Sequence, residues 1–165
     1  MRNLSVKKLA MTGVMAALVF VMTYVPKVPV PATGGYVHLG DGAIFLAALT
    51  LGPLGIPAAA IGSGLSDLMG GYVVYALPTV VIKGLMAFAA WKICREGAWL
   101  RTALAFLLAE AVMVAGYFLF ETVTFGAASA WGAVGPNCIQ GAAGVVLGMV
   151  CSALTPRLRR MLKRI

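Results

Sequence analysis

Apolar stretches separated by short breaks rich in proline, glycine or charge make up most of this sequence. The first stretch ends just before Pro26, which opens a loop with further prolines, and another ends at Gly52-Pro53. Proline lacks the N–H that a helix interior needs, and glycine favours turns, so both residues punctuate helices. The pattern predicts helices over residues 5–24, 41–51, 56–69, 75–93, 99–122 and 131–154.

The second of these helices is shorter than the rest. A helix that crosses a bilayer needs about 20 residues, and the stretch 41–51 is roughly half as long. We expect this helix to be short, tilted or partly re-entrant. Alternatively, residues 41–51 and 56–69 form one re-entrant pair.

Composition sets the class of protein. The chain has 165 residues, of which 61% are hydrophobic and 11% charged, and its mean hydropathy is +0.95. Soluble domains average about 45–50% apolar and about 25% charged residues, so a soluble enzyme, a disordered chain and a disulfide scaffold are excluded. We expect an all-α integral membrane protein with six transmembrane helices, in which residues 1–165 form a single membrane domain.

The basic residues cluster at three sites, and this clustering predicts the topology. The protein has 13 Lys and Arg residues and a net charge of +8. All but Lys27 and Lys83 precede the first apolar run, flank the break near residue 95 or follow the last helix; they are Arg2, Lys7, Lys8, Lys92, Arg95, Arg101, Arg157, Arg159, Arg160, Lys163 and Arg164. Because cytoplasmic loops collect Lys and Arg, we expect cytoplasmic N- and C-termini. The basic tail suits anionic membrane lipid, and nucleic acid is not an expected partner.

Polar and charged side chains within the apolar stretches predict a binding pocket. A charge within a membrane span is costly and usually pairs or lines a wet cavity. Most of these residues fall in the outer half of their helices when depth is counted at about 1.5 Å per residue. The candidate binding residues are His38, Asp41, Asp67, Tyr72, Tyr75, Lys83, Tyr117, Glu121, Asn137 and Gln140.

Structural roles are the alternatives for several of these residues. Lys83 could pair with Asp67 or Glu121 and serve only as an internal tie. Asp41 could cap the N-terminus of the second helix, because an aspartate accepts hydrogen bonds from the first backbone N–H groups.

The remaining alternatives concern aromatic residues and one carboxyl group. Tyr72 and Tyr75 could belong to an interfacial aromatic belt. His38 could be an ordinary solvated loop residue. Glu110, which lies nearer the middle of its helix, could accept a hydrogen bond from a neighbouring hydroxyl group.

The first helix carries small residues at helical spacing. Gly13 and Ala17 lie four residues apart and therefore share one face of it. Such small-residue faces let helices approach closely. We expect either internal packing or a docking face for a partner membrane protein.

Catalytic and metal-binding patterns are missing from the sequence. The three cysteines form no CxxC pair, and their spacing to the single histidine is unlike that of a metal site. The HExxH, GxSxG and phosphate-loop motifs are absent. We therefore expect no enzyme activity, no cofactor and no metal, and energy for any uphill transport must come from elsewhere.

Longer motifs carry a resemblance to a known family. Residues 35–86 contain YVHLGD, LGPLG, GSGLSDLMGGY and PTVVIKGLM, and later come MVAGYFLFE (113–121) and PNCIQGAAGVVLG (136–148). Together these segments resemble the substrate-binding S components of energy-coupling factor (ECF) vitamin transporters. The resemblance is nearest to the riboflavin-type S-component family and its pyridoxine/hydroxymethylpyrimidine-like branch.

The resemblance implies a high-affinity vitamin-binding subunit of an ECF-type importer in a prokaryotic plasma membrane. Such a protein has six helices, binds a vitamin or precursor near the outer face, and uses the loop at 26–40 as a lid. It docks on a transmembrane coupling subunit driven by two cytoplasmic ATPases. The family docks through an Ala-xxx-Ala motif on the first helix, for which Gly13 and Ala17 are the nearest match here.

The ligand and one other function class stay open. Carboxylates outnumber lysine in the expected pocket, which favours a polar, amine-bearing ring. A pyridoxine-like or hydroxymethylpyrimidine-like ligand is the first expectation, with riboflavin and a queuosine precursor as alternatives. A self-contained proton-coupled carrier or channel using Glu110 and Asp67, or a membrane-embedded enzyme or assembly factor, would also fit the composition.

Overall fold

The computed structural model describes residues 6–94 and 97–164. Two residues of the predicted basic sites, Arg2 and Arg95, lie outside the described residues, as does the predicted first residue of the first helix, Ser5. The elements in chain order are α1 (Val6–Tyr24), β1 (Val28–Val30), β2 (Gly35–Val37), α2 (Gly40–Leu51), the 3-10 turn η1 (Gly52–Leu54), α3 (Gly55–Met69), α4 (Val73–Ile93), α5 (Trp99–Phe125) and α6 (Ala127–Arg164).

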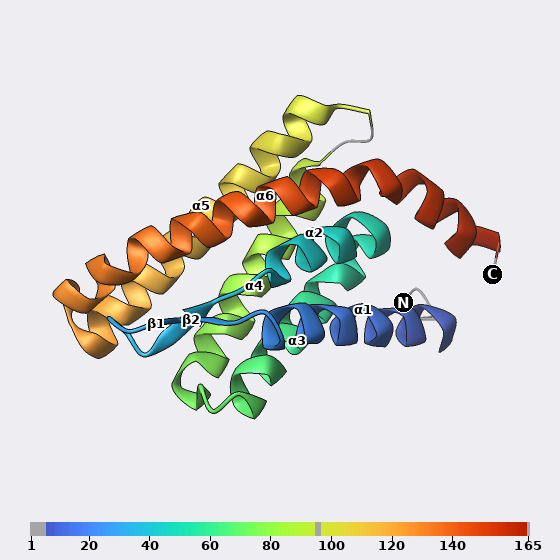
Figure 1. Cartoon of the computed structure of the whole chain (residues 1–165). Coiled ribbons are helices and arrows are strands. Elements are labelled where there is room, and N and C mark those ends of the chain that lie inside the picture. Colours follow the sequence, from blue (N-terminus) through green and yellow to red (C-terminus); the bar gives the residue numbers. More distant parts are fainter. Residues whose placement is uncertain (1–5, 95–96, 165) are drawn as a thin grey trace.

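The six α-helices form one bundle (Figure 1). The first turn of α1 and the last turn of α6 lie at the same end of it, at the right of Figure 1. Among the described residues, five helical segments are long and apolar enough to cross a membrane, and one of them, Gly40–Met69, includes both α2 and α3. Many large apolar side chains on α3–α6 face outward, as expected for a surface that contacts lipid.

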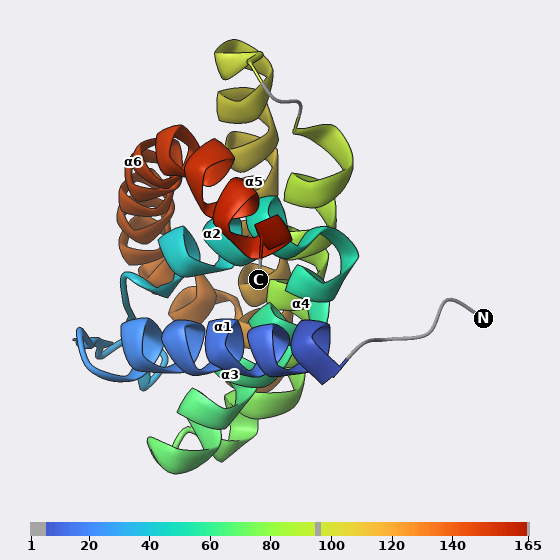
Figure 2. The ribbon, with the colours of Figure 1, turned by 90° about the vertical axis from the view of Figure 1, so that its right-hand side faces the viewer.

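Helix α2 is the innermost of the six. Nine of its twelve residues are buried, and it contacts α1, α3, α4 and α6 (Figure 2). Its Phe45 ring stacks on Phe106 of α5 with 4.1 Å between centroids. At 1.5 Å per residue, α2 is about 18 Å long, well short of the roughly 30 Å hydrocarbon core.

The chain turns back sharply between α2 and α3. At Gly55 a side chain would collide with the backbone of Ala47 and Ala48 at 2.5–2.6 Å. This close approach requires glycine at the start of α3. The two helices are thus separate elements joined by η1, each with its own direction.

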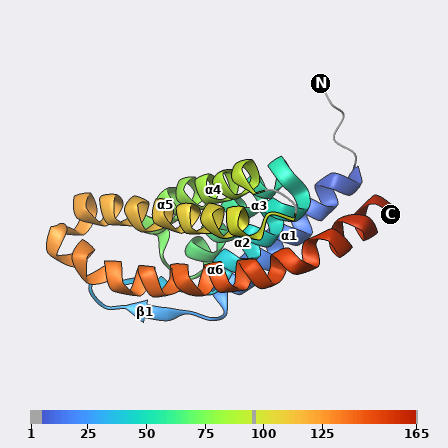
Figure 3. The ribbon, with the colours of Figure 1, turned by 90° about the horizontal axis from the view of Figure 1, so that it is seen from above.

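The proline-rich loop between α1 and α2 is more ordered than the sequence indicated. Strands β1 and β2 pair antiparallel, with Val28 opposite Val37 and Val30 opposite Gly35. The turn contains Gly34 at φ 65°, a backbone conformation that glycine adopts readily. We call residues 28–37 the hairpin; it runs along the first half of α6 (Figure 3).

The last helix extends beyond its predicted end. We expected a helix over 131–154 that stops before Pro156, but α6 runs from Ala127 to Arg164 with both Pro136 and Pro156 inside it. The prediction is wrong because tertiary contacts outweigh the lost hydrogen bond at Pro156. Three residues beyond that proline, Arg159 donates from Nε to the carbonyl oxygen of Leu49 (2.7 Å) and so ties the extension to α2.

Candidate functional site: a cavity beneath the hairpin

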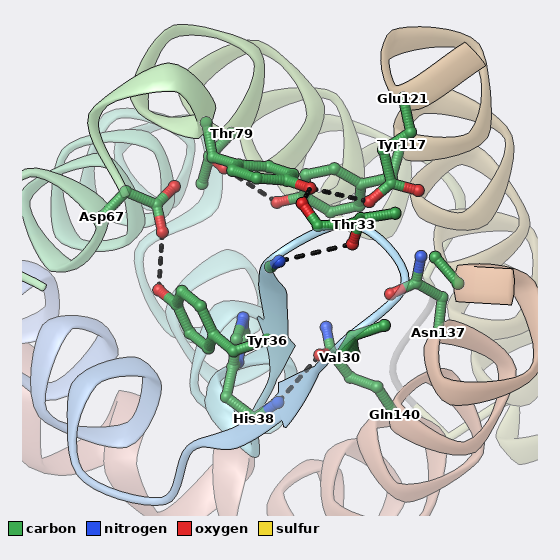
Figure 4. Close-up of a pocket in the computed structure, with 13 residues that line it drawn as sticks. Val30, Thr33, Tyr36, His38, Asp67, Thr79, Tyr117, Glu121, Asn137 and Gln140 are labelled. Atoms are coloured by element: carbon green, nitrogen blue, oxygen red, sulfur yellow. Dashed lines mark hydrogen bonds between the residues drawn. The ribbon is translucent and has the colours of Figure 1, made fainter. Parts of the chain in front are cut away.

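A small internal cavity lies between the hairpin and the helices at one end of the bundle (Figure 4). Its volume is about 20 Å³, enough for about one water molecule. Its walls combine carboxyl, hydroxyl and amide groups with few apolar side chains. The lining residues are Val30, Thr33, Gly35, Tyr36, His38, Asp67, Tyr75, Thr79, Tyr117, Glu121, Ala133, Asn137 and Gln140.

One wall ties the hairpin to the end of α3. The hydroxyl group of Tyr36 donates to Oδ1 of Asp67 at 2.6 Å and lies 3.2 Å from Oγ of Ser66. Asp67 is only 3% exposed, and its Oδ2 has no hydrogen-bond partner among the described residues. Burial and the nearby Asp67 carboxylate raise the pKa of Tyr36, so the Tyr36 hydroxyl keeps its proton and remains a donor.

The opposite wall is formed by α4 and α5. The Tyr75 hydroxyl lies 3.2 Å from the carbonyl oxygen of Thr33 and 3.1 Å from Oε1 of Glu121. The hydroxyl groups of Thr79 and Tyr117 are 2.9 Å apart. Glu121 is 3% exposed and its Oε2 has no partner among the described residues.

The floor of the cavity is organised by Gln140 of α6. Its Oε1 accepts a hydrogen bond from the backbone N–H of His38 at 2.8 Å. Its Nε2 donates to Oδ2 of Asp41 at 2.7 Å. One amide group therefore connects the end of the hairpin to the start of α2.

Behind this floor, Asp41 forms an ion pair with Lys83. Oδ1 lies 2.5 Å from Nζ, and neither side chain is exposed. The partners predicted for Lys83 as an internal tie are wrong, since it pairs with Asp41 and not with Asp67 or Glu121. The capping role predicted for Asp41 is also wrong, because the N-cap of α2 is Leu39 and no side chain caps it. The pair forms because α2 places Asp41 against α4 one layer below the cavity.

His38 is buried, so the expectation of a solvated loop residue is also wrong. Its Nδ1 accepts a hydrogen bond from the Gly40 N–H at 2.9 Å. Burial, followed by the nearby Lys83 charge, lowers the pKa of His38 to about 3. The imidazole ring is therefore neutral at physiological pH.

Most of the predicted binding residues come together around the cavity, although their role in binding stays a prediction. Those that line it are His38, Asp67, Tyr75, Tyr117, Glu121, Asn137 and Gln140. Three others do not: Asp41 and Lys83 lie behind the floor, and the Tyr72 ring contacts Tyr36 at 4.4 Å between centroids.

The sequence reasoning missed several lining residues. Tyr36 and Thr79 make hydrogen bonds there, while Val30, Thr33 and Gly35 come from the hairpin. A signal existed for two of them, since Tyr36 opens the YVHLGD segment and Thr79 belongs to PTVVIKGLM. The hairpin residues lacked one because their strands are too short to show an alternating pattern.

The acidic groups make the cavity a site for hydrogen-bond donors. Asp67 and Glu121 each present a buried oxygen that accepts no hydrogen bond from residues 6–94 or 97–164, and buried unpaired polar atoms are costly. Of the two nearest cations, Lys83 pairs with Asp41 and Lys27 does not line the cavity. A ligand that donates hydrogen bonds at two separated positions would satisfy both carboxyl groups.

A further carboxyl group, Glu110, lies outside the cavity. Both of its oxygens are buried without a hydrogen-bond partner among the described residues, so the predicted neighbouring hydroxyl does not meet it. Gly141 and Gly144 of α6 leave the space that its side chain occupies.

The two expected docking residues lie on the outer face of α1. Gly13 and Ala17 are exposed, and no atom lies within 4 Å of a side chain placed at Gly13. The alternative of internal packing therefore does not hold for Gly13 among the described residues. No group of His, Cys, Asp and Glu residues in the described parts of the chain could hold a metal ion.

Comparison with known proteins connects this arrangement to transport. The profile of a family described as ECF-type riboflavin transporter, S component, matches residues 3–155. A protein of Lactococcus lactis subsp. cremoris named thiamine precursor transporter HmpT is 32% identical over 161 residues, which cover 95% of this chain and 92% of that protein. An uncharacterised Pyrococcus woesei protein is 35% identical over 132 residues, or 79% of this chain and 88% of that protein.

Proposed function

The chain belongs to the ECF-type riboflavin transporter S component family, and from this membership we propose that it captures a vitamin precursor with a single heterocyclic ring in the cavity beneath the hairpin. The family is one of transporters, not enzymes, and the chain is a multi-pass protein of a prokaryotic plasma membrane. The proposed ligand class is that of hydroxymethylpyrimidine, with pyridoxine as the second candidate.

The unpartnered carboxyl oxygens of Asp67 and Glu121 carry this proposal. They suit a ring bearing amino and hydroxymethyl groups, both of which donate hydrogen bonds. The Tyr36, Tyr75 and Tyr117 rings are planar, apolar surfaces for a flat ligand. Similarity to a relative named as a thiamine precursor transporter also supports this class.

Cavity size favours a single ring over riboflavin. The cavity of about 20 Å³ must enlarge for any vitamin, and a three-ring flavin demands far more displacement than a pyrimidine. Enlargement is feasible because hydrogen bonds and short strands, not a large apolar interface, hold the hairpin. We therefore propose the loop at 26–40 as the lid of the site.

For topology we propose six spans with both termini in the cytoplasm. The separation of α2 from α3 supports six rather than five spans. The first turn of α1 lies at the same end of the bundle as the C-terminal end of α6 (Figure 1). The first of these segments contains Lys7 and Lys8, and the second contains Arg157 and Arg160. Lys and Arg favour the cytoplasmic side, which puts the cavity toward the outer face.

Transport then requires partner subunits. No nucleotide-binding motif occurs in the sequence, so we propose that a transmembrane coupling subunit and two cytoplasmic ATPases supply the energy. The exposed Gly13–Ala17 face of α1 is the proposed contact with the coupling subunit.

Direct binding tests the proposed function. Detergent-purified protein is titrated with hydroxymethylpyrimidine, pyridoxine and riboflavin by calorimetry, after mass spectrometry of any small molecule retained through purification. Stoichiometric binding of one of the single-ring compounds supports the proposal, and binding of riboflavin alone overturns the ligand class. Failure of all three, together with the absence of a retained heterocycle, overturns the function.

A carrier that works without other subunits is the second candidate, because neither carboxyl oxygen of the buried Glu110 has a hydrogen-bond partner among the described residues. Proteoliposomes that contain the chain alone separate the two. Uptake that collapses with the proton gradient favours the carrier, whereas uptake only with the coupling subunit and ATPases favours the S component.

A further inference from the structure

Lys27 lies in a cage of three tyrosine rings at the outer end of α1. Its Nζ is 4.2 Å from the ring centroid of Tyr24, 4.4 Å from that of Tyr36 and 5.2 Å from that of Tyr72. We call these three rings the tyrosine cage. All three distances are within the roughly 6 Å at which an ammonium group is attracted to a ring face.

Each ring of the cage belongs to a different part of the fold. Tyr24 ends α1, Tyr36 is in β2 of the hairpin, and Tyr72 precedes α4. Lys27 itself directly precedes β1. A single ammonium group therefore joins the hairpin to two elements of the bundle.

The cage reaches the cavity through Tyr36. One face of its ring contacts the Lys27 ammonium group, while its hydroxyl donates to Asp67 inside the cavity. Lys27 does not line the cavity. Lys27 can therefore act on a ligand through the position of Tyr36 and the hairpin, and through its attraction to the Asp67 carboxylate.

The charge environment of Lys27 fits this role. Partial burial lowers its pKa, and the Asp67 carboxylate opposes that effect. Asp67 thus attracts Lys27 at longer range and accepts the Tyr36 hydrogen bond directly. Both interactions pull the hairpin toward the end of α3.

We propose that Lys27 is a positioning residue that holds the hairpin in its closed position and thereby sets how fast the ligand enters and leaves the cavity. The part that concerns the ligand rests on the proposed function, whereas the part that concerns the hairpin does not. A closed hairpin is the state in which Tyr36, Thr33 and the His38 backbone make their hydrogen bonds to the bundle.

Hydrogen–deuterium exchange of the ligand-free full-length protein tests the hairpin directly. In K27M the side-chain length is kept and the charge is lost, so amides of residues 28–38 should exchange about tenfold faster. In K27R the charge and the ring contact are kept, so exchange should stay near that of the parent protein. Exchange in K27M equal to the parent, or equally fast in K27M and K27R, overturns the proposal.

Two further variants distinguish a local effect of K27M on the hairpin from a general loss of structure. Lys92 also lies over a ring, that of Trp91 at 5.1 Å, but at the other end of α4, so K92M should leave hairpin exchange unchanged. Tyr24→Leu removes one ring of the cage outside the cavity and should accelerate exchange less than K27M. Faster exchange throughout the protein in K27M, with helices included, would show a structural defect and overturn the positioning role.

Stopped-flow binding of hydroxymethylpyrimidine adds the kinetic part. If the hairpin limits passage in both directions, K27M raises the association and dissociation rate constants together, and the equilibrium constant changes much less than either. A change in dissociation alone overturns the gating claim. If hydroxymethylpyrimidine does not bind to the parent protein, the proposed ligand fails, while the exchange result still decides the role of Lys27.

Discussion

Asp41 of α2 and Lys83 of α4 form a fully buried ion pair, with Oδ1 and Nζ 2.5 Å apart. Gln140 donates a hydrogen bond to the other carboxylate oxygen, so both oxygens of Asp41 have a partner. The pair lies directly behind the cavity floor and fixes the start of α2 against α4 and α6. Its loss should therefore affect the fold before it affects the ligand.

Breaking this pair on one side should destabilise the protein strongly. Asp41→Asn or Lys83→Met leaves an uncompensated buried charge, which costs about 3–5 kcal/mol. The double variant removes both charges and should recover a large part of that loss. Circular dichroism measures the free energy of unfolding of the three variants in detergent. A loss in the double variant equal to the sum of the two single losses would contradict a direct ion pair.

Replacing the hydrogen-bond acceptors of the cavity should weaken ligand binding without unfolding the protein. Asp67→Asn and Glu121→Gln keep the side-chain shape but replace an acceptor oxygen by a donor. A hydrogen bond to a charged group is worth about 1.5–3 kcal/mol, so affinity for hydroxymethylpyrimidine should fall about 10- to 100-fold. Calorimetry checks this, and unchanged affinity in both variants would remove these residues from the site.

Gln140 should couple the hairpin to the ion pair. Gln140→Leu leaves the His38 N–H and one Asp41 oxygen without partners, so we expect about tenfold weaker ligand binding and a lower unfolding temperature. Ile139→Ala, at an exposed neighbouring position on α6, is the control and should change neither quantity in this way. Equal changes in ligand affinity and unfolding temperature in the two variants would argue against a specific role for the Gln140 amide.

His38 should make stability depend on pH in a defined direction. Its pKa is about 3 in the folded protein and about 6.5 when unfolded, so between these values the unfolded chain binds more protons. Stability therefore falls as the pH falls from about 6.5 toward 3, by up to about 1.4 kcal/mol per pH unit. His38→Asn keeps an acceptor for the Gly40 N–H and should reduce this dependence when melting at pH 7 and pH 5 is compared. An identical pH slope in parent and variant would contradict a buried neutral imidazole.

A bulky residue on the outer face of α1 should separate binding from transport. Gly13→Leu meets no atom within 4 Å and should leave ligand affinity unchanged, while blocking uptake in proteoliposomes with the coupling subunit and ATPases. Gly135 of α6 is equally open, so Gly135→Leu is the matched control and should support uptake. Normal uptake by Gly13→Leu would exclude this face from docking.

Local sequence features predicted that most of the helices exist more accurately than they predicted where each helix ends. Apolar runs and Gly-Pro breaks mark most helices, because lipid-facing and core-facing residues are both apolar. Pro156 misled the prediction of the last boundary, since the contact of Arg159 with Leu49 holds α6 together beyond it. Such a contact joins residues far apart in the chain and leaves no local pattern.

For the candidate site too, the sequence indicated which residues are unusual but not which of them contact one another. The sequence identified Asp67 and Glu121 as candidate site residues, because a carboxylate within a membrane span is costly and usually pairs or lines a wet cavity. The pairing of these charges could not be predicted in this way, because Asp41 and Lys83 meet only since α2 begins inside the bundle. The strand pairing of the hairpin and the contacts of Tyr36 and Thr33 were not predicted, because they depend on packing against α3, α4 and α6.

The short α2 has a consequence for how this fold can vary. Along α6, Gly144 and Gly148 pack against α2, whereas Gly132 and Gln140 contact the hairpin and the residue that follows it. The hairpin and α2 therefore pack one after the other along the same face of α6. The cavity thus lies where a longer α2 would otherwise continue toward that end of the bundle. If the cavity binds the ligand as proposed, changes in the hairpin and in the helix residues that line the cavity should alter ligand preference, while the part of α6 that packs on α2 can stay unchanged.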